Sequence, residues 1–127
     1  MGLAAVAALQ ACTTHNCQTT CRHVYEASEC DINQAGRTDD EAISDCVATC
    51  ESALQHPGGL CAPDPETGEE ECYDPHLRYP ANDRPVLQTD QQAAAWIDCV
   101  WEYAPSLGSQ SGCSNIDPLD GGFCAPI

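Results

Sequence analysis

The sequence predicts a small, disulfide-rich domain of the all-α class: an antiparallel helical hairpin plus a third helix and stapled loops. Eleven of its 127 residues are cysteine, a density typical of secreted disulfide scaffolds. Two pairs of cysteines have a spacing of four, which places each pair on one face of a helix. Apart from alanine and cysteine only 26 apolar residues remain. Because so few large side chains make a thin core, disulfides are expected to supply much of the stability.

The helical hairpin is expected within residues 12–61. Cys17 and Cys21 lie on its first helix, and Cys46 and Cys50 on its second. The segments flanking the turn at 31–37 are similar in length, which favours two antiparallel arms. In such a pair the lower cysteine of one helix faces the upper cysteine of the other. We therefore expect disulfides that join Cys17 to Cys50 and Cys21 to Cys46.

Capping signals indicate where the helices begin and end. Residues 38–41 read Thr-Asp-Asp-Glu, a capping box that starts the second helix. The sequence His-Pro-Gly-Gly at 56–59 ends that helix. Residues 89–92, Thr-Asp-Gln-Gln, repeat the capping pattern and start a third helix, which ends near Pro105.

Part of the chain is repeated. Asp-Cys-Val at 45–47 recurs at 98–100, and Gly-Gly-Leu-Cys-Ala-Pro at 58–63 recurs at 121–126 with Phe in place of Leu. The agreement of cap, helix and tail suggests a duplicated unit of one helix and one cysteine turn. Coincidence among small residues is the alternative.

The chain is expected to form one stapled domain over residues 12–127. Within it, residues 62–88 are rich in proline and acidic side chains and are predicted to form a loop. Residues 89–127 hold the third helix and a cysteine turn. Six cysteines outside the hairpin pairs leave fifteen pairings open. Among these we favour Cys61 with Cys72, Cys113 with Cys124, and Cys30 with Cys99.

Residues 1–11 are uncharged and mostly apolar, with the length of a signal-peptide core and too short to span a bilayer. The sequence Leu-Gln-Ala-Cys at 9–12 follows the pattern of a lipid-attachment site, with Cys12 as the modified residue. Eleven is an odd number, so lipid on Cys12 leaves ten cysteines for five disulfides. Secretion without lipid is one alternative. Another is that Cys12 forms a disulfide and a different cysteine stays reduced.

The charge of the chain excludes several partners. It has twenty acidic residues against four basic ones, and its net charge is -16. Nucleic acid and anionic membrane surfaces need many more cationic side chains than the four of this protein. Contact with a membrane is therefore expected only through a lipid anchor or a partner complex.

Motifs for catalysis or cofactor binding are missing from the sequence. The sequence has no C-x-x-C pair, which is typical of redox enzymes and zinc ribbons, and no nucleophile elbow, which is typical of hydrolases. We expect no enzyme activity and no cofactor. His15 and His23 flank the first cysteine pair and could join Cys17 and Cys21 around a metal if those cysteines were reduced. The favoured interpretation is that both histidines are exposed on a helix and bind no metal.

Acidic residues in the proline-rich loop invite a calcium hypothesis, because loops can supply the oxygen ligands that Ca²⁺ needs. The spacing is not that of an EF-hand, and a solvated acidic surface is the favoured interpretation. The weak calcium candidates are Asp64, Glu66, Glu69, Glu70 and Glu71.

Trp101 is the candidate contact residue for a partner. Trp96, Val100 and Tyr103 share one stripe of the third helix, whereas Trp101 projects from another face. An exposed tryptophan surrounded by acids is a typical interface anchor. The alternative is that both tryptophans pack in the core.

The twin C-x3-C helices after the Leu-Gln-Ala-Cys sequence resemble the cysteine-rich secreted and outer-membrane lipoproteins of some Gram-negative bacteria. The resemblance covers residues 9–61 well. It implies a disulfide-stapled helical domain on the periplasmic or outer face. Because motifs for catalysis are missing, we expect a non-catalytic structural or interaction protein, secreted or lipid-anchored, with a protein partner.

The twin C-x3-C pattern is also similar to that of small import chaperones of the mitochondrial intermembrane space. The 24 residues between Cys21 and Cys46 are more than that family usually has. A broader alternative is a stapled accessory subunit of a large membrane complex that faces an oxidising organelle lumen.

Overall fold

The computed structural model describes residues 15–32, 36–64, 66–77, 87–105, 112–117 and 122–124. This part of the chain is mostly helical and carries one small sheet. Its helices and strands, in chain order, are α2 (Cys17–Tyr25), α3 (Asp39–Leu54), β1 (Cys61–Pro63), β2 (Glu70–Cys72), α4 (Asp90–Tyr103) and the 3-10 helix η1 (Cys113–Asn115).

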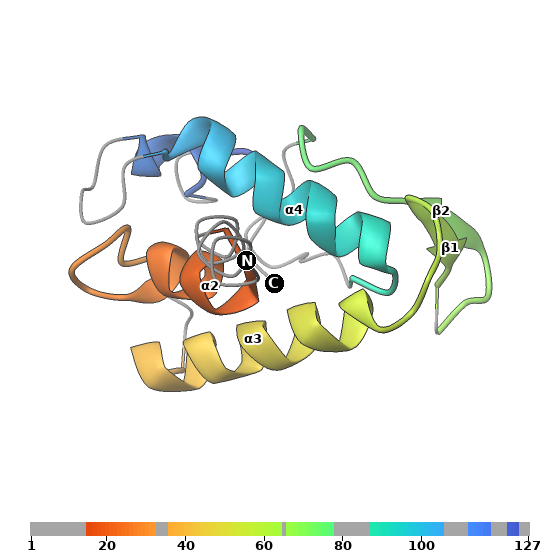
Figure 1. The fold of residues 1–127 in the computed structure, drawn as a ribbon, viewed down its shortest axis with the longest axis horizontal. Coiled ribbons are helices and arrows are strands. Elements are labelled where there is room, and N and C mark those ends of the chain that lie inside the picture. The colour runs from red at the N-terminus through yellow and green to blue at the C-terminus, as the bar shows by residue number, and fades with distance from the viewer. Residues whose placement is uncertain are drawn as a thin grey trace, which may run out of the picture.

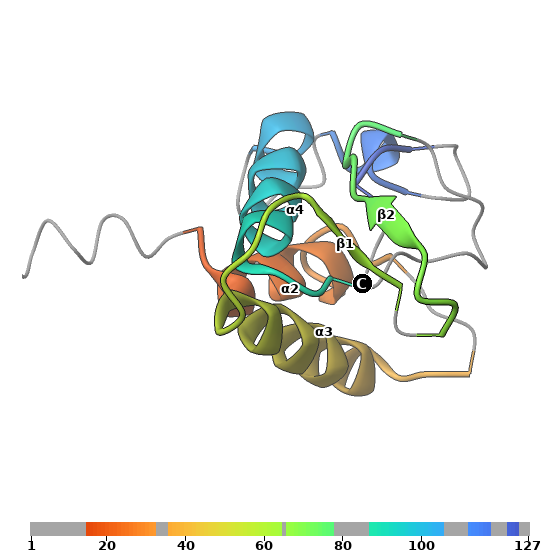
Figure 2. The same cartoon turned by 90° about the vertical axis from the view of Figure 1, so that its right-hand side faces the viewer.

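The three α-helices enclose the core. In Figure 1, α3 runs along one side of the molecule and α4 along the other, while α2 lies between them at one end and the two strands lie at the opposite end. Figure 2 shows α2 layered between α3 and α4. Each helix contacts the other two. The largest fully buried side chains include Trp96, Tyr25, Ile116, Val24 and Val100, together with several half-cystines.

Side-chain caps set the starts of α2 and α3. Asn16 Oδ1 accepts from Thr19 N at 2.8 Å, and Thr19 Oγ1 accepts from Asn16 N at 3.0 Å. Thr38 Oγ1 accepts from Glu41 N at 3.2 Å, and Glu41 Oε1 accepts from Thr38 N at 3.0 Å. The capping box predicted for the second helix is confirmed, and α2 has one of its own because Asn and Thr can make the same reciprocal bonds.

One of the two hydrogen bonds of the capping box predicted for α4 is confirmed, and the other is replaced by different contacts. Thr89 Oγ1 accepts from Gln92 N at 3.2 Å, as expected. The Gln92 side chain instead accepts from Gln88 N at 2.7 Å and donates to Leu60 O at 2.8 Å. Gln92 therefore ties the start of α4 to the segment before β1.

The two arms of the hairpin differ in length, contrary to the expectation of matched arms. Helix α2 has 9 residues and α3 has 16. After α2 the chain folds back on its end, since Cys30 N donates to His23 O and Ile32 N donates to Val24 O, both at 2.9 Å. This return places Ile32 in the core at 3% exposure.

The all-α prediction misses a β-hairpin, and residues 62–88 are not loop throughout. Strands β1 and β2 are antiparallel, with Cys61 opposite Cys72. Tyr73 N donates to Leu60 O at 2.9 Å. Cys61 and Cys72 are therefore a non-hydrogen-bonded pair, where facing side chains lie closest and a disulfide can join them.

The predicted duplication holds for the capped helices, because Thr38 and Thr89 each cap a helix that carries Asp-Cys-Val, but not for the described parts of the two tails. The first copy of the repeated tail enters β1 and forms its disulfide within the β-hairpin. In the second copy, residues 122–124 form no strand, and Cys124 bonds to α4 instead. Among the described residues, no helix is both long and apolar enough to cross a membrane.

Candidate functional site

Five disulfides cross-link the domain. Cys17 bonds Cys50 and Cys21 bonds Cys46, which confirms the pairing predicted from antiparallel helices. A further disulfide, between Cys61 and Cys72, is also as expected. A disulfide framework of this density indicates an oxidising compartment outside the cytoplasm.

The two remaining pairings correct the prediction. Cys30 bonds Cys113 and Cys99 bonds Cys124, instead of Cys30 with Cys99 and Cys113 with Cys124. Cys30 N donates to His23 O at the end of α2, and Asn115 of η1 donates to Tyr103 O at the end of α4, which docks on His23. Cys99 lies in the middle of α4, and the N–H of its partner Cys124 donates to Pro75 O. The spacing of the cysteines along the sequence predicts neither of these two contacts.

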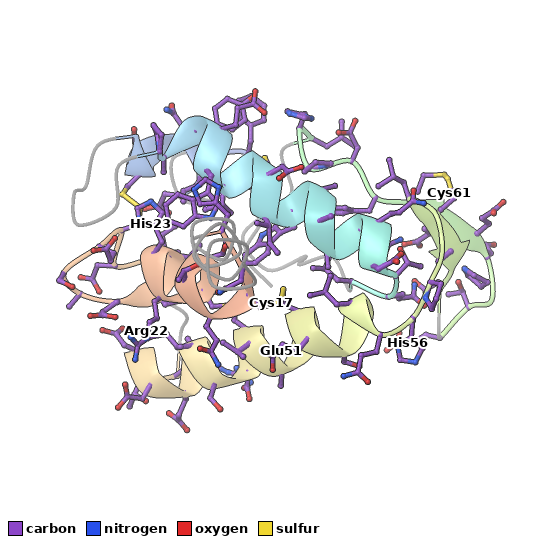
Figure 3. All side chains as sticks on the ribbon, in the orientation of Figure 1. Cys17, Arg22, His23, Glu51, His56 and Cys61 are labelled. Carbon is purple, nitrogen blue, oxygen red and sulfur yellow. A yellow bond between two sulfur atoms is a disulfide. The ribbon has the colours of Figure 1, made fainter. Side chains whose placement is uncertain are left out.

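His23 is buried, not exposed as predicted. It is 0% exposed, and in Figure 3 its side chain lies between α2 and α4. Nδ1 lies 2.6 Å from Glu29 Oε1, and Nε2 lies 2.6 Å from Ala104 O. Because the carbonyl only accepts, a proton on Nε2 donates to Ala104, and a second proton lies between Nδ1 and the carboxyl group. His23 therefore ties the end of α4 to α2 and to the turn after it.

Trp101 packs directly on this histidine, and the prediction that it is exposed is wrong. The indole is stacked between His23 and His15, with ring centroids 4.5 and 4.4 Å away. Its Nε1 donates to Thr20 Oγ1 at 2.8 Å. Trp101 is 6% exposed and Trp96 is 0% exposed, so the alternative that both tryptophans fill the core is the right one. Helix α2 covers the face of α4 that was expected to be open.

His15, Trp101, Thr20, His23 and Glu29 form one cluster of stacked rings and hydrogen bonds. Sequence reasoning missed it because Glu29 approaches His23 across the end of a helix, where helical spacing no longer applies. His15 is exposed at one face of the stack. Since His23 is buried and hydrogen-bonded through both nitrogens, its imidazole links two helices and is not open to solvent.

The residues of the alternative metal hypothesis have other contacts. Cys17 and Cys21 are in disulfides and are not available to His15 and His23. Within the described part of the chain, no group of three or more histidine, cysteine or acidic residues is placed to hold a metal ion.

The calcium candidates belong to the β-hairpin. Asp64 Oδ1 accepts from Glu66 N at 2.7 Å and from Thr67 N at 3.2 Å, which closes the turn between the strands. These backbone bonds, that of Glu66 first, hold the pKa of Asp64 below its ordinary value. The other four candidates are exposed on the hairpin, as expected for a solvated acidic surface: Glu66, Glu69, Glu70 and Glu71.

Cys12 lies outside the described residues. The five disulfides use the ten cysteines from Cys17 to Cys124. Cys12 is the one cysteine of the sequence that none of these disulfides uses. No protein-family model, curated protein or solved structure matches the chain.

Proposed function

We propose that this is a non-catalytic structural or interaction protein, secreted or held at a membrane surface by lipid on Cys12, in the periplasm, at the outer membrane or outside the cell. One observation carries the proposal: ten of the eleven cysteines pair with one another, and Cys12 is outside these five disulfides. The cysteines serve architecture first, as expected for a small domain with few large apolar side chains.

The charge of the protein supports a covalent anchor over simple adsorption. A net charge of -16 opposes approach to anionic headgroups. Cys12 follows a Leu-Gln-Ala sequence and stands five residues before the start of α2 at Cys17. Lipid at that position would hold the domain close to the bilayer without any cationic surface.

A protein partner is the expected ligand of this scaffold. Trp101 is not available for such contact, because it is buried. The large apolar side chains that are exposed in the described part of the chain are Leu54 at 44%, Leu60 at 42% and Leu77 at 53%.

The test is the intact mass of the mature protein isolated from its native membranes or medium. A polypeptide that begins at Cys12 and carries diacylglyceryl and acyl groups is the expected result. Cys12→Ser, which leaves all five disulfides available, should abolish the lipid mass and release the domain from membranes.

A mature protein that begins at Met1 with unmodified Cys12 would refute the anchor. It would also favour the alternatives, a stapled accessory subunit facing an organelle lumen or a small chaperone-like protein of the intermembrane space. A mass that begins near Cys12 without lipid would identify a secreted form instead.

A further inference from the structure

The disulfide between Cys61 and Cys72 differs from the other four in its exposure. Both of its half-cystines are exposed. Six half-cystines, those of the hairpin pairs and of Cys99–Cys124, are at most 2% exposed, and Cys30 and Cys113 are half-buried. In Figure 3, Cys61 and its disulfide lie at the edge of the molecule, away from the three-helix core. A thiolate must reach a sulfur atom directly to attack it.

We propose that Cys61–Cys72 is a site of thiol–disulfide exchange, which a dithiol reductant or dithiol oxidoreductase opens while the other four disulfides persist. The site does not depend on the lipid anchor proposed above.

The exchange is a two-electron reaction with a defined balance. A thiolate of the dithiol attacks the sulfur of Cys61 or Cys72, the S–S bond breaks, and the other cysteine leaves as a thiolate that takes up a proton. The second thiol of the reductant then attacks the mixed disulfide and releases the first cysteine. The dithiol becomes a disulfide, and the protein gains two thiols.

The structure confines the effect of this reaction to the β-hairpin. Before β1, Thr89 Oγ1 donates to Gly59 O at 2.7 Å and Gln92 Nε2 donates to Leu60 O at 2.8 Å. After β2, Tyr73 is buried at 6% exposure. These contacts hold both ends of the hairpin when its disulfide opens. Two short strands alone are at most marginally stable, so the segment between the ends should become mobile.

The charge around the disulfide selects among reductants. Glu70 and Glu71 precede Cys72 on β2 and are exposed. Their carboxylates repel an anionic thiolate, and salt weakens this repulsion. Dithiothreitol, which is uncharged before it ionises, should therefore react more readily than glutathione, which carries a net negative charge. The matching oxidoreductase is one with an uncharged or cationic surface around its thiols.

The test begins with the oxidised full-length protein, with the Cys12 thiol blocked by N-ethylmaleimide. Brief exposure to dithiothreitol, followed by acid quenching, isotopically heavy N-ethylmaleimide and peptide mapping, identifies which thiols appear first. Cys61 and Cys72 should appear at least about tenfold faster than any other cysteine, because buried disulfides react only after local unfolding. Hydrogen exchange of the partially reduced protein should rise at the amides of Ala62 and Glu71 and stay unchanged in the helices. First release of any other pair, or release of all five together, would overturn the proposal.

Two variants test the assignment and its charge dependence. Cys61→Ser/Cys72→Ser should remove the fast phase and leave the slow phases, and a fast phase that persists would overturn the assignment. Glu70→Gln/Glu71→Gln should accelerate reduction by glutathione more than reduction by dithiothreitol. The matched control removes two exposed carboxylates of α3, in Asp40→Asn/Glu51→Gln, and should change neither rate. Equal effects of the two charge variants would refute the selectivity for uncharged reductants.

Discussion

Replacement of His23 by leucine should remove a buried polar link between α2 and the end of α4. The imidazole is 0% exposed and lies 2.6 Å from both Glu29 Oε1 and Ala104 O. A hydrogen bond to a charged group contributes about 1.5–3 kcal/mol, and a buried carbonyl that loses its donor costs about 1–3 kcal/mol. Leucine fills much of the same volume, so packing losses are small beside these two effects. We expect His23→Leu to lower the free energy of unfolding by about 4 kcal/mol.

Guanidinium unfolding of the oxidised protein, followed by tryptophan fluorescence, measures this loss. Trp101 stacks on His23 at 4.5 Å and should report the change directly. With an m-value of about 3 kcal/mol per M, the midpoint should fall by about 1.3 M. The matched control is His76→Leu. His76 is also close to a carboxylate, Glu102 at 3.3 Å, but both side chains are exposed, so the change should stay within about 0.5 kcal/mol.

A double-mutant cycle tests the reasoning. Glu29→Leu alone deprives His23 of the acceptor at Nδ1, whereas His23→Leu/Glu29→Leu removes both members of a buried pair together. The double variant should be less destabilised than the sum of the single variants by about 2 kcal/mol. Additive effects, or a loss under about 1 kcal/mol for His23→Leu, would refute a buried hydrogen-bonded pair.

Two further predictions concern the backbone and a helix cap. Gly112 has a φ of +80°, and an added Cβ would lie 2.1 Å from Tyr103 O. Gly36 has a similar φ of +79°, but no atom lies within 4 Å of its added Cβ. Gly112→Ala should therefore lower the melting temperature far more than Gly36→Ala, and equal losses would show that backbone strain alone matters. Hydrogen bonds from Thr38, the backbone bond first, hold the pKa of Glu41 below its ordinary value of 4.5. The stability that the Glu41 carboxylate adds is therefore present above pH 4.5 and is lost as the pH falls through the lowered pKa. The difference in melting temperature between the wild type and Glu41→Gln should therefore close on acidification, and a difference independent of pH would contradict this.

Local chemistry in the sequence predicted where α3 and α4 begin and end, and three of the five disulfides. Thr38 and Thr89 are caps because the hydroxyl of each accepts from the backbone N–H three residues later, a bond that needs no contact from outside the helix. Cys17 and Cys21 find their partners on α3 because helical spacing and an antiparallel arrangement leave one good register. These features depend on few residues and short distances along the chain.

Contacts between distant segments were not predictable in this way. The Cys30–Cys113 disulfide spans 83 residues, and no periodic pattern relates its two ends. Spacing shows which side chains of α4 share a face with Trp101, but not which segment covers that face. Strands of three residues, one with proline, carry no alternating pattern that would predict β1 or β2.

The overlap of three disulfides decides what a protease can achieve. The loops closed by Cys17–Cys50, Cys30–Cys113 and Cys99–Cys124 overlap along the chain. Any single peptide bond between Cys17 and Cys124 therefore lies inside at least one closed loop, and its hydrolysis releases no fragment. The nicked protein keeps its mass apart from one added water, and only reduction separates the pieces. In an oxidising compartment, one cut by a protease leaves a single covalent molecule whose packed helices are still held together.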